Sequence, residues 1–266
     1  LEEAGVHGLS LESTHVLRID ATTVHEALRQ VKSSTLGFDG LHGVVQHRIA
    51  QSPKPPSAAP PTFIAQGGRW LSLTSPLKHL VGAWDAVDGS HALLSVNALR
   101  LDAENIRSAG TDGAGVVALA RVAGCGPDGG AVLRMRGGGG AARSTAHAWA
   151  NAGGRVHLLE GRRPLAPALP DSALAGPSEL AVLGIDFDGD GDGLEAGKHL
   201  TPAYQNKALH AEGSLDEVRL DGRWMLVAQH LEAWRMLWAP ELEPALPSIA
   251  ELMGDLVAVE ALLDGR

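Results

Sequence analysis

The sequence predicts an α/β protein with a parallel sheet flanked by helices and an N-terminal mixed α/β region. Three observations support this fold class. The chain of 266 residues is 44% hydrophobic and 20% charged, so it can bury a sizeable core. Residues 180–187 (LAVLGIDF) are apolar apart from Asp186, which is typical of a strand buried in a parallel sheet. Residues 131–160 contain a strand, a glycine run, a helix and a second strand in succession, as in a βαβ unit.

The first part of the chain contains both strand patterns and a helix pattern. Residues 15–20 alternate as in a strand, and residues 22–31 place apolar side chains on one face of a helix. Residues 79–101 alternate again around the dipeptide Asp88-Gly89, which is a strong hairpin signal. We therefore expect a mixed α/β region in this part.

The central strands are predicted at residues 131–135 and 155–160, and the helix between them extends through Trp149. The tetraglycine 137–140 precedes that helix. Backbone N–H groups at such a place can hold a phosphate, but the Lys-Ser/Thr of a P-loop is missing, which favours a flexible turn.

Beyond the apolar run, the patterns predict mainly helices. Residues 194–200 (LEAGKHL) suggest the start of a helix, and residues 217–227 suggest a hairpin around Asp221-Gly222. Two apolar helical segments follow, at 226–238 and 248–263.

The most informative segment is an aspartate ladder directly after the apolar run. Four carboxylates at alternate positions repel one another, and a hard divalent cation such as Mg²⁺, Mn²⁺ or Ca²⁺ would compensate that charge. A solvated acidic turn is the alternative. The ladder consists of Asp186, Asp188, Asp190 and Asp192.

Two known kinds of acidic loop match this ladder incompletely. An EF-hand calcium loop needs a carboxylate at its twelfth position, where Gly197 or His199 stands here. The phosphohexomutases carry a similar DGDGD loop, but Gly193 occupies the position of the arginine that ends their motif. A sugar-phosphate enzyme of that type stays an alternative, as does a non-enzymatic protein with a structural cation site.

The order of several motifs resembles toprim proteins, the metal-dependent domain family of bacterial-type primases and topoisomerases. In that family a glutamate followed by glycine ends one strand, and a D-x-D motif ends a later strand. Residues 126–135 and 80–102 also look like elements that precede the glutamate in phage- and plasmid-type primases. The matching positions are Glu160, Gly161, Asp188, Asp190, Gly193, Ala196 and Leu200.

The resemblance implies a toprim-like sheet and a DNA-primase-type nucleotidyltransferase that uses Mg²⁺ or Mn²⁺ in DNA replication. Glu160, Asp186, Asp188 and Asp190 would then hold the metal, and Glu160, Asp188 and Asp190 would be catalytic. It also implies single-stranded DNA and nucleotides as partners, with a replicative helicase or a zinc-binding module supplied by another chain. The implied division is a mixed region at 1–128, a metal-binding domain at 129–211 and a C-terminal hairpin with helices at 212–266.

Arginines outnumber acidic residues near the predicted metal loop, although the whole chain has a net charge of −9. A local basic face of this kind is expected to contact nucleic acid or phosphate, with scattered solvated arginines as the alternative. The candidates are Arg134, Arg136, Arg143, Arg162 and Arg163.

Composition excludes several other classes. No apolar run is long enough for a membrane span, and the first residues do not resemble a signal peptide, so a cytoplasmic protein is expected. Cys125 is the single cysteine, which excludes an internal disulfide framework.

Overall fold

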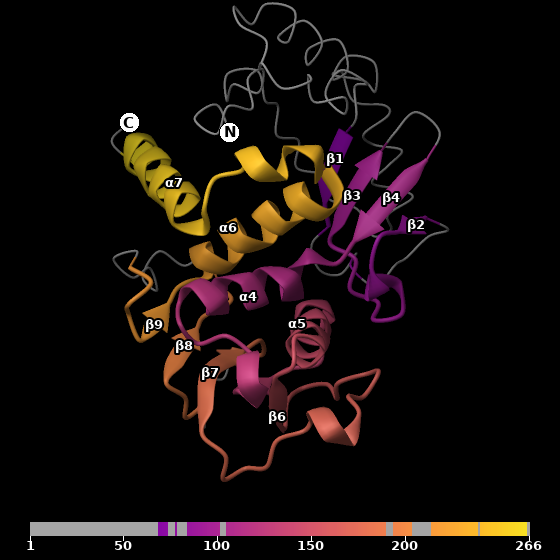
Figure 1. The fold of residues 1–266 in the computed structure, drawn as a ribbon, viewed down its shortest axis with the longest axis vertical. Helices are drawn as coiled ribbons and strands as arrows, with labels where there is room; N and C mark the ends of the chain where they lie inside the picture. Colours follow the sequence, from indigo (N-terminus) through magenta and orange to yellow (C-terminus); the bar gives the residue numbers. More distant parts are fainter. Residues whose placement is uncertain are drawn as a thin grey trace, which may run out of the picture. The chain divides into compact units, whose positions relative to one another are not determined.

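The computed structural model describes residues 69–73, 78, 84–101, 105–189, 194–203, 214–238 and 240–264 (Figure 1). The chain divides into two compact units. The first comprises Leu1–Ala109 and Ala233–Pro247, and the second comprises Gly110–Glu232 and Ser248–Arg266. These limits differ from the predicted ones at 128 and 211. The strand and helix predicted within residues 15–31 lie outside the described residues.

The first unit contains a four-stranded mixed sheet in the order β1-β3-β4-β2, in which β2 runs parallel to β4 and the other pairs are antiparallel. Its apolar core gathers Leu73, Val96, Leu99 and Leu101. Its elements are β1 (Arg69–Ser72), β2 (Asp85–Ala86), η3 (Gly89–His91), β3 (Ala98–Leu101), β4 (Ile106–Ala109), η7 (Trp234–Trp238) and η8 (Pro240–Ala245).

The hairpin predicted at Asp88-Gly89 is wrong. The Asp88 carboxylate instead accepts a hydrogen bond from the backbone N–H of Ser90 at 3.0 Å and caps the short helix η3. Capping is a frequent role of aspartate, and it competes with the turn conformation that the dipeptide favours in hairpins.

The second unit is built on a five-stranded sheet in the order β6-β5-β7-β8-β9, and every pair in it is parallel. The predicted α/β class with a parallel sheet flanked by helices is therefore confirmed. Its elements are α4 (Thr111–Val122), η4 (Asp128–Gly130), β5 (Val132–Arg136), α5 (Gly140–Asn151), β6 (Arg155–Leu159), η5 (Asp171–Ala173), β7 (Ala181–Asp186), β8 (Lys198–Leu200), β9 (Arg219–Leu220), α6 (Gly222–Ala233) and α7 (Ile249–Asp264).

A sixth chain segment extends this sheet. Leu174 forms an isolated parallel bridge with Val156 of β6, and the N–H of Ala175 donates to the Val156 carbonyl at 2.9 Å. Numbered along the chain from β5, the order across the sheet becomes 3-2-1-4-5-6. That is the order of doubly wound dinucleotide-binding sheets.

Two predictions after β7 are wrong. The predicted helix at residues 194–200 is the strand β8, which pairs with β7 and β9. The predicted hairpin at Asp221-Gly222 is the start of α6, where the Asp221 carboxylate accepts the backbone N–H of Arg223 at 2.8 Å. The two helical segments predicted near the C-terminal end are confirmed as the α6–η7 stretch and α7.

One face of the sheet in the second unit is apolar and lies under helices. Leu133 and Met135 of β5 alternate to this face beside Leu183 and Ile185 of β7, and all four are fully buried. In Figure 1, α4, α5 and α6 lie together on one side of the strands. Gly113 of α4 allows the closest approach, because a Cβ there would overlap the backbone of α5.

The opposite face is covered by loops. Arg134, on the alternate side of β5, is buried and donates to the carbonyl oxygens of Pro177, Glu179 and Glu195 at 2.8–3.1 Å. Its Nε also donates to Nδ1 of His157 on β6 at 3.1 Å. A single guanidinium thus fastens two loop segments to the sheet.

Candidate functional site

The site lies at the carboxyl edge of the second unit's sheet, where β5, β6 and β7 end side by side. The chain leaves β5 toward β6 on one side, whereas β7 lies on the other side of β5. Loops that follow β5 and β7 therefore diverge at this point. Open α/β sheets bind their ligands in the crevice at such a switch point.

The first two glycines of the loop between β5 and α5 are each required by a close neighbour, whereas the third is not. Gly137 has a φ of +119°, and a Cβ there would lie 2.9 Å from Cβ of Phe187. A Cβ at Gly138 would overlap the backbone carbonyls of Arg163 and Pro164. At Gly139, by contrast, no atom of the described residues lies within 4 Å of the Cβ position. The loop is thus packed at its first two glycines and open at the third.

The open glycine is also the N-cap of α5. Gly139 has extended backbone angles and no side chain to cap the helix, and Ala142 in the first turn is buried. The first amides of a helix have no acceptor within the helix, and its dipole places partial positive charge there. Backbone N–H groups at Gly139 and Gly140 therefore suit an anionic group such as a pyrophosphate.

Glu160 and Gly161 follow β6. Glu160 comes directly after the last residue of the strand, and its side chain is exposed. Gly161 comes next, and a Cβ on it would lie 2.6 Å from Oδ2 of Asp188. The loops after β6 and β7 therefore touch at this glycine.

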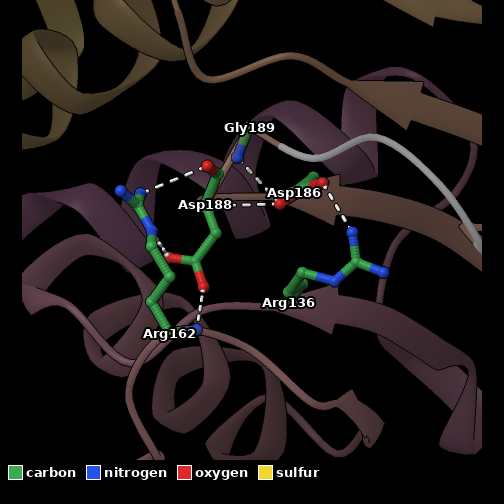
Figure 2. A network of polar contacts seen from close by, with 5 residues as sticks. All are labelled: Arg136, Arg162, Asp186, Asp188 and Gly189. Atoms are coloured by element: carbon green, nitrogen blue, oxygen red, sulfur yellow. Dashed lines mark hydrogen bonds and ion pairs between the residues drawn. The ribbon is translucent and has the colours of Figure 1, made fainter.

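Asp186 ends β7 and is engaged on both of its carboxylate oxygens. Its Oδ2 accepts from Nη1 of Arg136 at 3.1 Å, and its Oδ1 accepts the backbone N–H groups of Asp188 and Gly189 at 2.9 and 3.0 Å (Figure 2). Both side chains of the Arg136–Asp186 pair are largely buried. Asp186 therefore fixes the turn that leaves the sheet.

Asp188 is held by Arg162 across the crevice. Its Oδ2 accepts the backbone N–H of Arg162 at 2.6 Å, and its Oδ1 lies 3.4 Å from Nε of the same residue. Nη2 of Arg162 also donates to the Asp188 carbonyl at 3.1 Å (Figure 2). The Asp188 side chain is 10% exposed and that of Arg162 is 69% exposed.

This geometry does not assemble the predicted metal site. Glu160 follows β6 and the aspartates follow β7, and β5 lies between these strands. The ends of β6 and β7 are therefore about 9.5 Å apart, although the loops that follow them meet where Gly161 and Arg162 contact Asp188. The carboxylates of Asp186 and Asp188 are neutralised by arginines instead, and the described residues hold no group of three His, Cys, Asp or Glu side chains able to bind a metal. Asp190 lies outside the described residues.

The five arginines do not form one basic face. Arg134 is buried in the loop-covered face of the sheet, and Arg136 and Arg162 pair with the two aspartates. Arg143 donates to the Gly138 carbonyl at 3.4 Å. Burial lowers the pKa of the Arg143 guanidinium, and the nearby positive charge of Arg163 lowers it further. Arg143 and the backbone carbonyl of Arg163 therefore both lie close to Gly138 of the glycine loop.

No protein-family model matches the chain, and no curated protein matches it by sequence. Several solved structures share its fold. An Ael1 enzyme from Pseudomonas putida is 20% identical, with a TM-score of 0.54 over 73% of this chain and 80% of that one. A chorismate mutase/shikimate 5-dehydrogenase fusion protein from Clostridium acetobutylicum is 16% identical, with a TM-score of 0.52 over 70% and 76%.

A third structure is the shikimate 5-dehydrogenase from Listeria monocytogenes, solved in complex with shikimate and NAD. It is 15% identical, with a TM-score of 0.51 over 71% of this chain and 77% of that one. At this level of identity the likeness shows the fold. The sheet order derived above agrees with it, since it is the order of dinucleotide-binding sheets.

The toprim interpretation is therefore wrong. The chain shares its fold with these three solved structures and not with toprim proteins. The expected primase activity, the Mg²⁺ or Mn²⁺ cofactor and the DNA and helicase partners depended on the toprim resemblance and are wrong with it. The phosphohexomutase and structural-cation alternatives have no support in these similarities either. Among the described helices, none is long and apolar enough to cross a membrane.

Sequence reasoning considered a phosphate site at the glycine loop but favoured a flexible turn. The pattern Gly137-x-Gly139-x-x-Ala142 follows a strand and opens a helix, and Glu160 comes about 20 residues later, after the next strand. That combination is the fingerprint of dinucleotide-binding βαβ units. The four consecutive glycines obscured it, because a run of glycines fits a flexible turn equally well.

Proposed function

We propose that the protein is an oxidoreductase that uses a nicotinamide dinucleotide, of the shikimate-dehydrogenase type. The observation that carries the proposal is the glycine loop at the switch point of the sheet. Gly139 leaves open space above the N-terminus of α5, and Gly137 and Gly138 pack the rest of the loop against neighbouring backbone. A pyrophosphate needs that close approach to backbone N–H groups.

The residues around the loop fit the other parts of a dinucleotide. The N–H groups of Gly139 and Gly140 would bind the pyrophosphate, and Ala142 allows α5 to pack closely on the sheet. The exposed carboxylate of Glu160, at the end of β6, would accept hydrogen bonds from the adenosine ribose hydroxyls. When bound, the dinucleotide supplies the hydride acceptor or donor, and these residues bind and orient it.

One of the similar structures supports a choice of substrate class. The enzyme from Listeria monocytogenes was solved with shikimate, a carboxylic acid that carries ring hydroxyl groups. We expect this chain to oxidise a secondary alcohol of a small hydroxylated acid to a ketone, with transfer of the hydride to the dinucleotide and release of the hydroxyl proton. Shikimate is the first substrate to test.

A variant of the open glycine tests the proposal directly. Gly139→Ala places a methyl group where the protein has space, so it should leave the fold intact and block the approach of a pyrophosphate. We expect the Kd for NADH, measured by fluorescence titration, to rise about tenfold or more, which corresponds to about 1.4 kcal/mol of binding free energy. Reduction of NAD⁺ in the presence of shikimate, followed by NADH absorbance, should fall in parallel.

Gly254→Ala is the matched control. Gly254 lies in α7, and no atom of the described residues lies within 4 Å of its Cβ position either. The control should bind NADH as the wild type does. If the wild type binds neither NADH nor NADPH at millimolar concentration, or if both alanine variants bind NADH as the wild type does, the proposed site is wrong.

A further inference from the structure

Arg162 has an unusual position for an exposed arginine, because three contacts hold it to a single aspartate. Its backbone N–H and its Nε contact the Asp188 carboxylate at 2.6 and 3.4 Å, and its Nη2 contacts the Asp188 carbonyl at 3.1 Å (Figure 2). Single ion pairs at a protein surface contribute little. Here a backbone hydrogen bond and a second donor fix the geometry, so the guanidinium is held at the β7 loop.

Arg162 lies where a bound dinucleotide would place its adenosine ribose, so its contacts with Asp188 affect cofactor binding. Arg162 follows Glu160 by two residues, at the end of the second strand of the dinucleotide-binding unit. The residues at this place contact the 2′ position of the adenosine ribose: a carboxylate binds the hydroxyl of NAD, and an arginine binds the phosphate of NADP. The chain carries both side chains, so which of them is available decides the cofactor.

We infer that Asp188 is a specificity-determining residue: by engaging Arg162, it leaves Glu160 to contact the ribose, and the protein prefers NAD over NADP. The inference rests on the proposed function, since it concerns the same crevice. The Asp188 carboxylate also adds negative charge beside the place of a 2′-phosphate, which opposes NADP further.

Gly161 shows that the contact is built into the backbone. A Cβ at this position would lie 2.6 Å from Oδ2 of Asp188 and 3.0 Å from the backbone N of Gly137. The carboxylate can reach the N–H of Arg162 because the residue before it is glycine. Asp186 supports the same arrangement from the other side, since its Oδ1 accepts the N–H of Asp188 and sets the direction of that residue.

Asp188→Asn is the decisive variant. It keeps the shape of the side chain and an acceptor for the Arg162 N–H, but it removes the charge that holds the guanidinium. We expect the ratio of the Kd for NADPH to the Kd for NADH to fall about tenfold relative to the wild type, which is the effect of one repulsive charge removed and one arginine released. Fluorescence titration of the full chain with each reduced dinucleotide measures the ratio.

The double variant Asp188→Asn/Arg162→Ala separates the two causes. If Arg162 is the group released, the double variant should lose most of the NADPH gain, whereas Asp188→Asn/Arg163→Ala should keep it. Asp128→Asn is the control, because Asp128 forms an exposed ion pair with Arg121 at 3.4 Å elsewhere in the same unit. It should leave the ratio unchanged.

The outcomes distinguish this inference from the proposed function. A wild type that binds NADPH as tightly as NADH, or an unchanged ratio in Asp188→Asn, overturns the role of Asp188 and leaves the dinucleotide site standing. A ratio that shifts equally with and without Arg162 also overturns it. Absence of dinucleotide binding in every variant, including the wild type, overturns the proposed function itself.

Discussion

The two faces of the sheet in the second unit are covered by different means. On one face, Leu133 and Met135 pack under helices and are fully buried. On the other face, Arg134 reaches from the same strand to three backbone carbonyls of two loops. The first face is stabilised by burial of apolar surface, which is not directional, and the second by directional hydrogen bonds from one charged group.

In most α/β units helices cover both faces of the sheet, whereas in this unit loops contact one of the faces. The segment between β6 and β7 contains Pro164, Pro167, Pro170 and Pro177, and proline disfavours a continuous helix. A loop cannot satisfy its own carbonyls as a helix does, and a buried guanidinium supplies several donors at once. Arg134 therefore holds these loops to the sheet through its guanidinium.

The largest loss of stability should come from a substitution on the helix-covered face. Leu133→Ala removes a fully buried side chain from the centre of β5, and we expect the free energy of unfolding to fall by about 3 kcal/mol. Urea denaturation measures the change. Leu180→Ala is the control, because Leu180 is 93% exposed and its truncation should change the free energy by less than about 0.5 kcal/mol. Equal losses in both variants would contradict the assignment of the apolar face.

A substitution on the loop-covered face should cause a smaller loss of stability, confined mainly to the loops. Arg134→Met keeps an unbranched side chain and removes the donors, so we expect a loss of about 2 kcal/mol. Residues 164–180 should also become sensitive to limited proteolysis before the whole unit unfolds. Arg121→Met, at an exposed ion pair, should show neither effect. Unchanged proteolysis in Arg134→Met would mean that other contacts hold these loops.

The smallest effect should be a dependence of the stability on pH that is caused by His157. Burial lowers the pKa of His157, and the charge of Arg134 lowers it further, against a smaller opposing influence of Glu179. The folded state therefore binds a proton less readily than the unfolded state. Stability should decrease as the pH falls below about 6.5 and should stop changing below the folded-state pKa.

His157→Asn tests the source of this pH dependence. It keeps an acceptor for Arg134 and removes the titration, so the decrease in the free energy of unfolding between pH 7 and pH 5 should become smaller than in the wild type. Part of the decrease should persist, because burial and the charge of Arg219 also lower the pKa of His199. An unchanged profile would show that His157 does not titrate differently on folding.

The sequence predicted the parts of the fold that local patterns determine. The βαβ unit at 131–160 and the strand β7 were recognised because apolar periodicity and glycine boundaries agree there. The strand β8 was missed, because three residues carry too little periodicity and their pairing partners come from distant parts of the chain. A hairpin was predicted where α6 starts, because aspartate followed by glycine is common both in hairpin turns and at the start of a helix, where Asp221 caps α6.

The grouping of the site residues depended on the order of the strands. We expected Glu160 and Asp188 to follow neighbouring strands, whereas β5 lies between those strands and the contacts to Asp188 come from Gly161 and Arg162. Strand order in a doubly wound sheet reverses at the first strand, and the local sequence does not record that reversal. The alternating aspartates indicated a metal site because of their concentrated negative charge. Two of them are neutralised by Arg136 and Arg162, and these ion pairs form only in the folded chain.

Gly161 has a consequence for motion at the mouth of the crevice. Because the loops after β6 and β7 meet within the length of one aspartate side chain, a displacement of either loop must pull the other with it. Backbone relaxation measured at Arg162 and at Gly189 should therefore report one shared process with a common exchange rate. Alanine at position 161 would force the two loops apart and give each of them its own rate.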